Sequence, residues 1–325
     1  MRQIVLEQPG RFVSVDAAPP KPRADEALVR VHRVGVCGTD LHAFAGRQPF
    51  FTYPRVLGHE LGVEVVEAPA NGRGVRPGDR CAVEPYLNCG QCHACRAGKY
   101  NCCERLQVLG VHTDGGMREL IAVPVERLHK SERLSLDQLA LVETLGIGAH
   151  AVARSGLRPG EDALVVGAGP IGLAVVQFAL AAQGHVRVLE TSPERREFVA
   201  HLGVETLEAP DDRLADVVFD ATGNAAAMGQ SLGRVAHAGR LVFVGLVQGP
   251  VSIDDPLFHR REMTLLATRN SAGDFPRIIQ MIEQGLIDTA PWITHRCALW
   301  EVSSLFPELP RAKHCVKAMI EVAGA

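Results

Sequence analysis

A charge-free stretch of twenty residues, ALVVGAGPIGLAVVQFALAA at positions 163–182, constrains the fold of this chain more than any other feature. Its length matches a membrane span, but GAGPIG interrupts it with three glycines and Pro170. A short β-branched run, a glycine-rich turn and an Ala/Leu-rich run predict a buried strand, a tight turn and a helix instead. We therefore expect no membrane segment.

The glycines of this turn, Gly167, Gly169 and Gly172, match the pattern G-x-G-x-x-G between a strand and a helix. The first permits a tight turn, the second lets a pyrophosphate approach the helix N-terminus, and the third allows the helix to pack closely on the strand. Further apolar runs follow at residues 216–223, 240–246 and 263–268. Their continuity predicts a parallel sheet buried on both faces, and hence a doubly wound domain that binds a dinucleotide.

The next strand-like run, HVRVLE, ends at Glu190, 18 residues after Gly172. An acidic residue at this place bonds the ribose 2′-hydroxyl of NAD and repels the 2′-phosphate of NADP. Arg195 and Arg196 follow closely and could reach a phosphate, although Arg196 also fits a solvated charge at a helix start. We predict NAD as the cofactor, with NADP less favoured.

Five of the nine cysteines lie in CGQCHACRAGKYNCC, residues 89–103. The N-terminal MRQIVLEQPGRF lacks an apolar signal core, so we expect a cytoplasmic protein whose cysteines stay reduced. Clustered cysteines in such a protein indicate a metal site or catalysis rather than disulfides.

Four of these cysteines have the spacing of a closed zinc site: Cys89, Cys92, Cys95 and Cys103. Zinc prefers four soft ligands in a tetrahedron, and a site closed by four thiolates is structural. Glycines within the stretch supply the backbone freedom that tight turns need. An iron–sulfur cluster is the rival interpretation, and a zinc-ribbon interaction module would show the same cysteines. Cys102 is either a substitute ligand or a bystander.

Two upstream motifs, GVCGTDLHAFAG and LGHELG, place Cys37, His59 and Glu60 in two glycine-flanked turns. A soft, a borderline and a hard ligand from two segments can hold one ion and leave a position open, as a Lewis-acid zinc requires. Taken singly, a buried cysteine is usually a core residue and a His-Glu pair usually lies on the surface. The combination predicts a second, open metal site.

GVCGTDLH, GHELG, the four-cysteine stretch and GAGPIG occur in the order and approximate spacing of the zinc-dependent medium-chain alcohol and polyol dehydrogenases. The chain resembles this family over nearly its whole length. The resemblance implies two zinc ions per chain and an α/β architecture. A GroES-like, β-rich catalytic domain would comprise residues 1–147 and 288–325, with a doubly wound Rossmann domain inserted at residues 148–287.

The resemblance also assigns the open metal site. It implies that Cys37 and His59 bind catalytic zinc and that Glu60 is a ligand or an exchangeable neighbour of the metal-bound water. Glu143, in LALVETLGIGAH, matches the remaining ligand of the sorbitol-dehydrogenase-like branch, with a helix N-cap or a surface acid as the alternative. Asp40 would accept the free ring N–H of His59 and fix its tautomer.

A route for the substrate proton follows from the same resemblance. Thr39 would bond the substrate oxygen and pass its proton on, and His42 would release it near solvent. An ordinary histidine pKa of about 6.5 suits that role, although a lone histidine in a loop is more often incidental.

The cofactor would contact the glycine-rich turn, including Pro170 and Ile171, with Arg195 beside the adenosine ribose. Lys317 matches a family position that meets the pyrophosphate, and one more surface lysine is the alternative.

Two segments concern the substrate. TLLATRNSAGDFP places Arg269 just after a strand, and this segment and GRQPFFTYPRVLGHE resemble the branch that acts on sugar acids such as galactonate or gulonate. A guanidinium suits a carboxylate or several hydroxyls, although a structural salt bridge fits Arg269 equally well.

We therefore expect a zinc-dependent oxidoreductase that transfers a hydride between NAD and a secondary hydroxyl of a polyol or sugar acid. A threonine-dehydrogenase-like or simple secondary-alcohol enzyme is the first alternative, and an NAD-binding sensor without turnover is the second. The net charge of −3 and the lack of basic clusters exclude a nucleic-acid partner. Relatives imply a homodimer or homotetramer.

Overall fold

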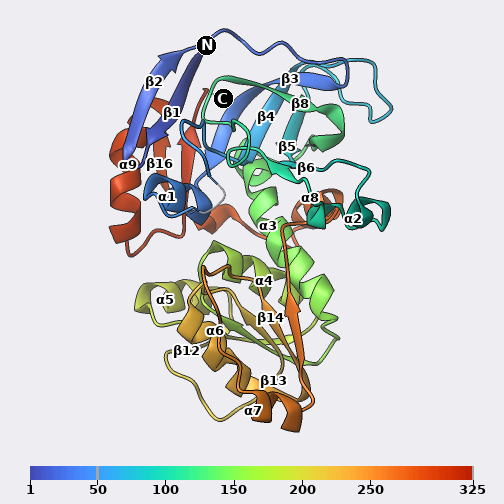
Figure 1. The fold of residues 1–325 in the computed structure, drawn as a ribbon, viewed down its shortest axis with the longest axis vertical. Coiled ribbons are helices and arrows are strands. Elements are labelled where there is room, and N and C mark those ends of the chain that lie inside the picture. Colours follow the sequence, from blue (N-terminus) through green and yellow to red (C-terminus); the bar gives the residue numbers. More distant parts are fainter. Residues whose placement is uncertain (49–50, 324–325) are drawn as a thin grey trace. The chain divides into compact units, whose positions relative to one another are not determined.

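The computed structural model describes residues 1–48 and 51–323, and the chain forms two compact units. The first unit comprises Met1–Glu143 and Phe275–Ala325, and the second is Thr144–Asp274 (Figure 1). The second unit is thus inserted into the sequence of the first. Of GRQPFFTYPRVLGHE, positions 49 and 50 lie outside the described residues.

The first unit is built on a seven-stranded sheet of order β16-β17-β3-β4-β5-β9, in which β8 also pairs with β3. Its strands are β1 Arg2–Gln8, β2 Arg11–Asp16, β3 Glu26–Gly35, β4 Glu60–Glu67, β5 Arg80–Val83, β6 Tyr86–Leu87, β7 Gln107–Val108, β8 Leu120–Pro124, β9 Leu128–Lys130, β16 Ile293–Ala298 and β17 Lys317–Glu321. Its helices are α1 Gly38–Phe44, α2 His93–Arg96, α8 Phe275–Glu283 and α9 Val302–Glu308, and α3 Leu136–Ser155 continues into the second unit. Apolar residues that alternate along the strands, such as Val29, Val31 and Val63, form one continuous buried core.

Helix α8 belongs to the first unit. The ring of Phe275 lies 5.1 Å from the ring of His129, and the Ser131 hydroxyl donates to Glu283 at 2.6 Å. The apolar side chains of α8 are buried, so the helix packs as part of this unit. The return to the first unit therefore begins at Phe275, whereas the sequence places it at about residue 288.

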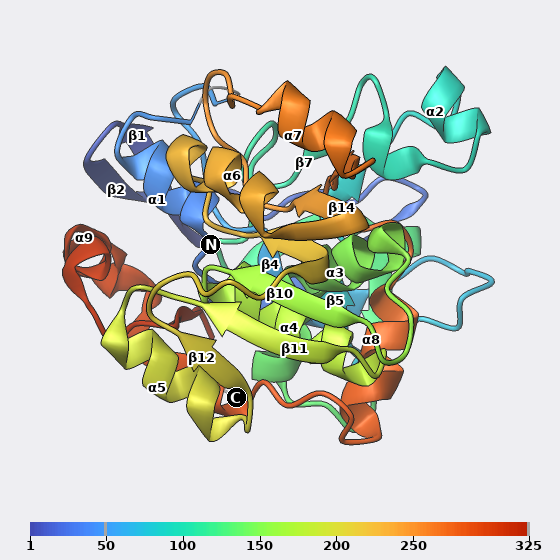
Figure 2. The ribbon, with the colours of Figure 1, turned by 90° about the horizontal axis from the view of Figure 1, so that it is seen from below.

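The second unit contains a six-stranded sheet of order β12-β11-β10-β13-β14-β15, and every pair in it is parallel. Its strands are β10 Asp162–Val166, β11 His185–Leu189, β12 Glu205–Leu207, β13 Ala215–Asp220, β14 Val235–Phe243 and β15 Thr264–Ala267. Its helices are α4 Pro170–Ala181, α5 Pro193–His201, α6 Ala225–Ser231 and α7 Asp255–Arg260. Figure 2 shows β11 between β10 and β12, on one side of the point where the strand order reverses. This confirms the predicted doubly wound topology.

The charge-free stretch is divided between β10 and α4, as its glycines predict. Gly167 has a φ of 93°, and a Cβ atom on Gly172 would lie 1.9 Å from the Gly167 carbonyl oxygen. Only glycine at both positions lets α4 start this close to β10. Among the described residues, no helix combines the length and apolar character that a membrane crossing needs.

Candidate active site and metal centres

Strand pairing brings the two upstream motifs together. β3 and β4 are antiparallel, and Gly35 at the end of β3 faces Glu60 at the start of β4. Cys37 follows β3, and His59 precedes β4, so both lie at the same end of this strand pair. Gly58 has a φ of 97°, and a Cβ atom there would lie 2.7 Å from the Val34 side chain. The turn that presents His59 therefore requires glycine.

The side chains of Cys37, His59 and Glu60 converge. One ligand atom from each lies within 4.8 Å of the others. His59 and Glu60 are buried, and Glu60 Oε2 has no hydrogen-bond partner in the part of the chain that is described. Buried polar atoms without partners cost free energy unless something satisfies them. A bound cation would do so, and the sulfur, nitrogen and oxygen donors suit zinc.

Asp40 fixes the turn that carries Cys37. Its buried carboxylate accepts the Cys37 N–H through Oδ2 at 2.9 Å. Its other oxygen lies 3.7 Å from His59 Nδ1, which is close contact but longer than a hydrogen bond. Burial opposes a charge on His59, but Asp40 and Cys37 outweigh it and raise the pKa of His59 well above its ordinary value. The pocket therefore favours a positive charge.

Glu60 has a buried cationic partner, Lys317. The Lys317 ammonium donates to Glu60 Oε1 at 2.5 Å, and 2% and 1% of the two side chains are exposed. This contact occupies the ammonium that the resemblance assigns to the cofactor pyrophosphate, so that role remains a prediction. On the other side, a Cβ atom on Gly35 would lie 2.0 Å from Glu60 Oε2. Gly35 thus makes room for the carboxylate.

Glu143 lies on α3 and is the last residue of the Met1–Glu143 segment of the first unit. It is buried near this group without joining its three tightly clustered atoms. The hydroxyl of buried Tyr86 donates a hydrogen bond to Glu143 Oε1. Burial raises the pKa of Glu143, while His59 acts in the opposite direction. Burial and the Glu143 carboxylate raise the pKa of Tyr86 well above its ordinary value, so this hydroxyl remains a donor. Glu143 therefore remains a predicted ligand.

Helix α1 carries the two residues of the predicted proton route. Thr39 is half-buried and His42 is exposed. Residues three apart on a helix lie on the same face, so the two side chains share one face of α1.

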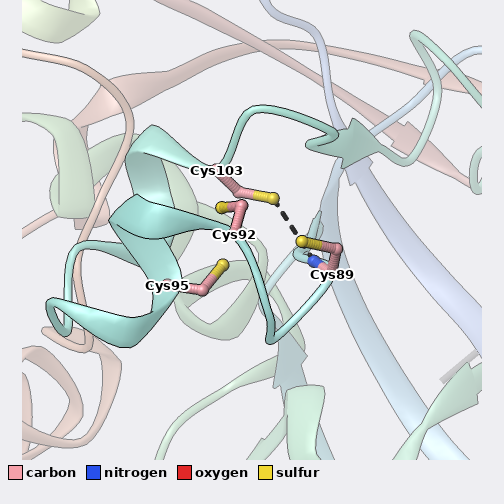
Figure 3. Close-up of side chains that lie close together, drawn as sticks. All are labelled: Cys89, Cys92, Cys95 and Cys103. Carbon is pink, nitrogen blue, oxygen red and sulfur yellow. Dashed lines mark hydrogen bonds between the residues drawn. The ribbon is translucent and has the colours of Figure 1, made fainter.

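The four cysteines of the second metal centre converge in Figure 3, with all four sulfur atoms within 4.8 Å of one another. Gly90 and Gly98 both have a φ of 73°, so the left-handed turns that bring the cysteines together need glycine. The sequence spacing predicts this grouping. Cys102 is exposed and lies outside the group.

Backbone N–H groups point at these sulfur atoms. The N–H groups of Cys89 and Arg105 donate to Cys103 Sγ at 3.3 and 3.4 Å. Donors from Gln91 and Cys92 lower the pKa of Cys89 to about 6, whereas burial raises the pKa of Cys103 to about 11. N–H donors stabilise thiolates, so the lobe fits a metal held by sulfur.

A cavity of about 670 Å³ in the second unit lies beside the glycine-rich turn. Of the predicted cofactor residues it is lined by Gly167, Gly169, Pro170, Glu190 and Arg195. Gly172 and Ile171 are not part of the lining, and Gly172 acts through the close packing of α4. The Gly169 residue is the N-cap of α4, where an anion is favoured.

Glu190 is tied to this turn. Its Oε2 accepts the Ala168 N–H at 2.7 Å, and its Oε1 accepts the Ser192 N–H at 2.8 Å. Arg196 bonds the Glu190 and Thr191 carbonyls and pairs with Glu208, so it has a structural role.

Arg269 is exposed and follows β15 in the second unit, next to Asn270 with a φ of 53°. Asparagine tolerates this conformation well. The substrate role of Arg269 remains a prediction.

Sequence reasoning missed two contributors, Tyr86 and Gly35. Tyr86 lies in EPYLNC, three residues before the first cysteine of the lobe. A tyrosine there can pack its ring among apolar side chains and use its hydroxyl for a hydrogen bond outside the lobe, which is the signal that could have identified it. Gly35 precedes Cys37 by two residues but matches no general glycine motif. Gly35 has no room for a Cβ because β3 pairs with β4 and places Glu60 against it, which the sequence alone does not reveal.

Comparisons with known proteins agree with this arrangement. Residues 23–133 match the family of alcohol dehydrogenase GroES-like domains, and residues 170–284 match the family of zinc-binding dehydrogenases. The chain is 41% identical over 310 residues to an L-galactonate-5-dehydrogenase of Escherichia coli K12, covering 91% of each chain. It is 34% identical to a 2-dehydro-3-deoxy-L-galactonate 5-dehydrogenase of Pseudoalteromonas atlantica, covering 92% of each.

The fold matches solved structures equally well. An alcohol dehydrogenase of Escherichia coli CFT073, solved with NADH, superposes with a TM-score of 0.93 at 28% identity, covering 99% of each chain. These matches confirm the predicted GroES-like and Rossmann architecture.

Proposed function

We propose that this chain, which belongs to the zinc-binding alcohol dehydrogenase family, oxidises a secondary hydroxyl of a sugar acid or related polyol with NAD as the hydride acceptor. Membership of this family makes the chain an oxidoreductase, as the sequence predicts. The observation that carries the proposal is the convergence of Cys37, His59 and Glu60 at the end of β3 and β4. A non-catalytic sensor would not need this open group.

When bound, zinc supplies Lewis-acid polarisation of the substrate hydroxyl and NAD accepts the hydride. We assign Cys37, His59 and Glu143 to hold the metal, with Glu60 as its exchangeable neighbour. Thr39 orients the substrate oxygen and takes its proton, and His42 passes that proton to water. Their positions on α1, half-buried and exposed, support this direction of transfer.

The second metal and the cofactor are assigned to the two remaining groups of residues. We assign Cys89, Cys92, Cys95 and Cys103 to a structural zinc, supported by their grouped sulfur atoms. The cavity beside Gly167 is proposed to take NAD in preference to NADP, because the carboxylate of Glu190 lies in its lining.

The proposed substrate class is a sugar acid, because two relatives that span most of the chain are named as galactonate-type dehydrogenases. Such a substrate carries a carboxylate and several hydroxyls. Arg269 is proposed to bind one of them, supported by its exposure after β15.

The experiment is a spectrophotometric screen of protein with a measured zinc content. Aldonates, polyols, threonine and simple alcohols are each supplied with NAD⁺ or NADP⁺, and NADH or NADPH formation is followed by absorbance. Preferred turnover of aldonates with NAD⁺ and about two zinc ions per chain is the expected result. Preference for threonine or a simple alcohol would replace the substrate class, and no turnover with both metals bound would favour the sensor.

We propose that the two units divide the work as in the family, with Met1–Glu143 and Phe275–Ala325 catalytic and Thr144–Asp274 binding the nucleotide. We also propose a homodimer or homotetramer, which light scattering coupled to size-exclusion chromatography would test. We also propose a cytoplasmic location, because cysteines that hold metals as thiolates are maintained by a reducing compartment.

A further inference from the structure

We propose that Tyr86 is a positioning residue that couples the four-cysteine lobe to the candidate catalytic metal site. Its ring packs inside the lobe, and its hydroxyl holds the carboxylate of Glu143. The inference rests on the proposed assignment of Glu143 as a metal ligand. It adds that the closed metal centre, by fixing Tyr86, sets how firmly the open centre holds its metal.

The lobe side of this connection is an apolar cluster. Tyr86 packs there with Cys92, Cys103 and Leu106, and all four side chains are buried. Two of these residues are cysteines of the metal group, so the ring belongs to the same buried cluster as two of the proposed ligands. The position of the ring therefore depends on the geometry of the four cysteines.

The backbone ties Tyr86 to the same lobe. Tyr86 opens β6 and pairs with Val108 in β7, and the cysteine stretch lies between these two strands. The Leu109 N–H also donates to the Pro85 carbonyl at 3.1 Å. The lobe is thus closed at its base by the strand that carries the tyrosine.

The other end of the connection is Glu143. The two residues are 57 positions apart, and their hydrogen bond is buried. A hydrogen bond on Oε1 restricts the rotation of the carboxylate and leaves Oε2 as the oxygen that a cation can take. Partners that orient metal ligands in this way commonly contribute about 10- to 100-fold in metal affinity.

The first test uses Tyr86→Phe, which keeps the ring in the lobe and removes only the hydroxyl. The matched control is Tyr100→Phe, because Tyr100 lies in the same lobe, on the short helix Tyr100–Cys102, with its ring 5.9 Å from the Arg127 guanidinium. Zinc release to a chelating dye is followed by absorbance for each protein. We expect the faster-releasing zinc of Tyr86→Phe to leave about tenfold sooner or more, with the slower zinc and the control unchanged.

The second test addresses the coupling. Leu106→Ala and Cys92→Ser each disturb the lobe from within, and each is combined with Tyr86→Phe. If the lobe acts through the tyrosine hydroxyl, either change accelerates release from the open centre in the parent protein. In the Tyr86→Phe background, neither substitution then accelerates zinc release any further. Using both variants keeps the test valid where Cys92→Ser fails to fold.

Cobalt substitution gives a readout that is independent of turnover. A cobalt ion at the open centre reports its ligand geometry through visible absorption, and we expect its bands to shift in Tyr86→Phe but not in Tyr100→Phe. Unchanged release and unchanged bands in Tyr86→Phe, with two metals per chain, would overturn this inference and leave the proposed function intact. A parent protein that holds no metal at the open centre would overturn both.

Discussion

Lys317 and Glu60 form a buried ion pair beside the candidate metal group, with Nζ 2.5 Å from Oε1. They are 257 residues apart in the chain and lie on β17 and β4, the two strands that flank β3. Burial lowers the pKa of Lys317, but the charges of Glu60 and Cys37 outweigh it and raise that pKa overall. The pair gives the buried carboxylate of Glu60 a cationic partner next to the other metal-binding groups.

Replacing Lys317 by Met, which keeps the aliphatic stem, should destabilise the first unit strongly. The buried carboxylate of Glu60 would lose its cationic partner, and breaking such a pair costs about 3–5 kcal/mol. Urea denaturation followed by fluorescence measures the loss. The double variant Lys317→Met/Glu60→Gln is the control and should recover much of the stability, because it leaves no charge unpaired. Equal destabilisation in both proteins would refute the argument.

The features predicted from sequence are those set by short stretches of chain. Local geometry is set by the spacing of Cys89, Cys92 and Cys95 and by the glycines of the turn at Gly167. These patterns can therefore be recognised in the sequence without knowledge of the fold. Lys317 and Tyr86 are different, because their partners come from distant strands and helices. A lysine that opens an apolar strand, KAMIE, is the only local sign that its charge is buried. The start of the return at Phe275 likewise depends on contacts of α8 with His129 and Ser131.

Gly35→Ala should displace the Glu60 carboxylate. The added Cβ would lie 2.0 Å from Glu60 Oε2, and no ordinary contact is that short. We expect a lower kcat together with weaker metal retention, measured by steady-state kinetics and zinc analysis. Gly72→Ala is the control, because a Cβ there meets nothing within 4 Å. Normal activity in Gly35→Ala would mean that Glu60 can move without consequence.

Cysteine alkylation at pH 8, read by mass spectrometry, should separate three classes of thiol. Exposed Cys102 should react in the zinc-loaded protein, while the four lobe cysteines react only after a chelator removes the metal. Cys81 and Cys297 should resist in both states, because burial raises the pKa of each to about 12. Their protonated fraction falls only as the pH rises toward that value, so reactivity should grow with pH. Alkylation of the lobe cysteines before chelation would contradict the structural metal.

Glu190→Ala should reduce the preference for NAD over NADP. The carboxylate lines the cofactor cavity and would repel a 2′-phosphate, so we expect the ratio of the two kcat/KM values to fall about tenfold or more. Because Glu190 also accepts the Ala168 N–H, some loss of affinity for both cofactors should accompany the change. Glu208→Ala, at the same cavity, serves as the control for a general loss of negative charge. An unchanged ratio in Glu190→Ala would remove this residue from cofactor selection.

Cys37→Ser should abolish oxidation while NAD binding persists. The hydroxyl is a poorer zinc ligand than the thiolate, so the open centre should lose its metal and zinc content should fall by about one ion per chain. Loss of Lewis-acid stabilisation worth several kcal/mol corresponds to a fall in kcat of about a thousandfold or more. The cofactor cavity belongs wholly to the second unit, so NADH affinity, measured by fluorescence titration, should change little. Cys102→Ser removes a thiol outside both metal groups and should match the parent protein. Retained turnover in Cys37→Ser would show that the reaction does not depend on the metal group at the end of β3.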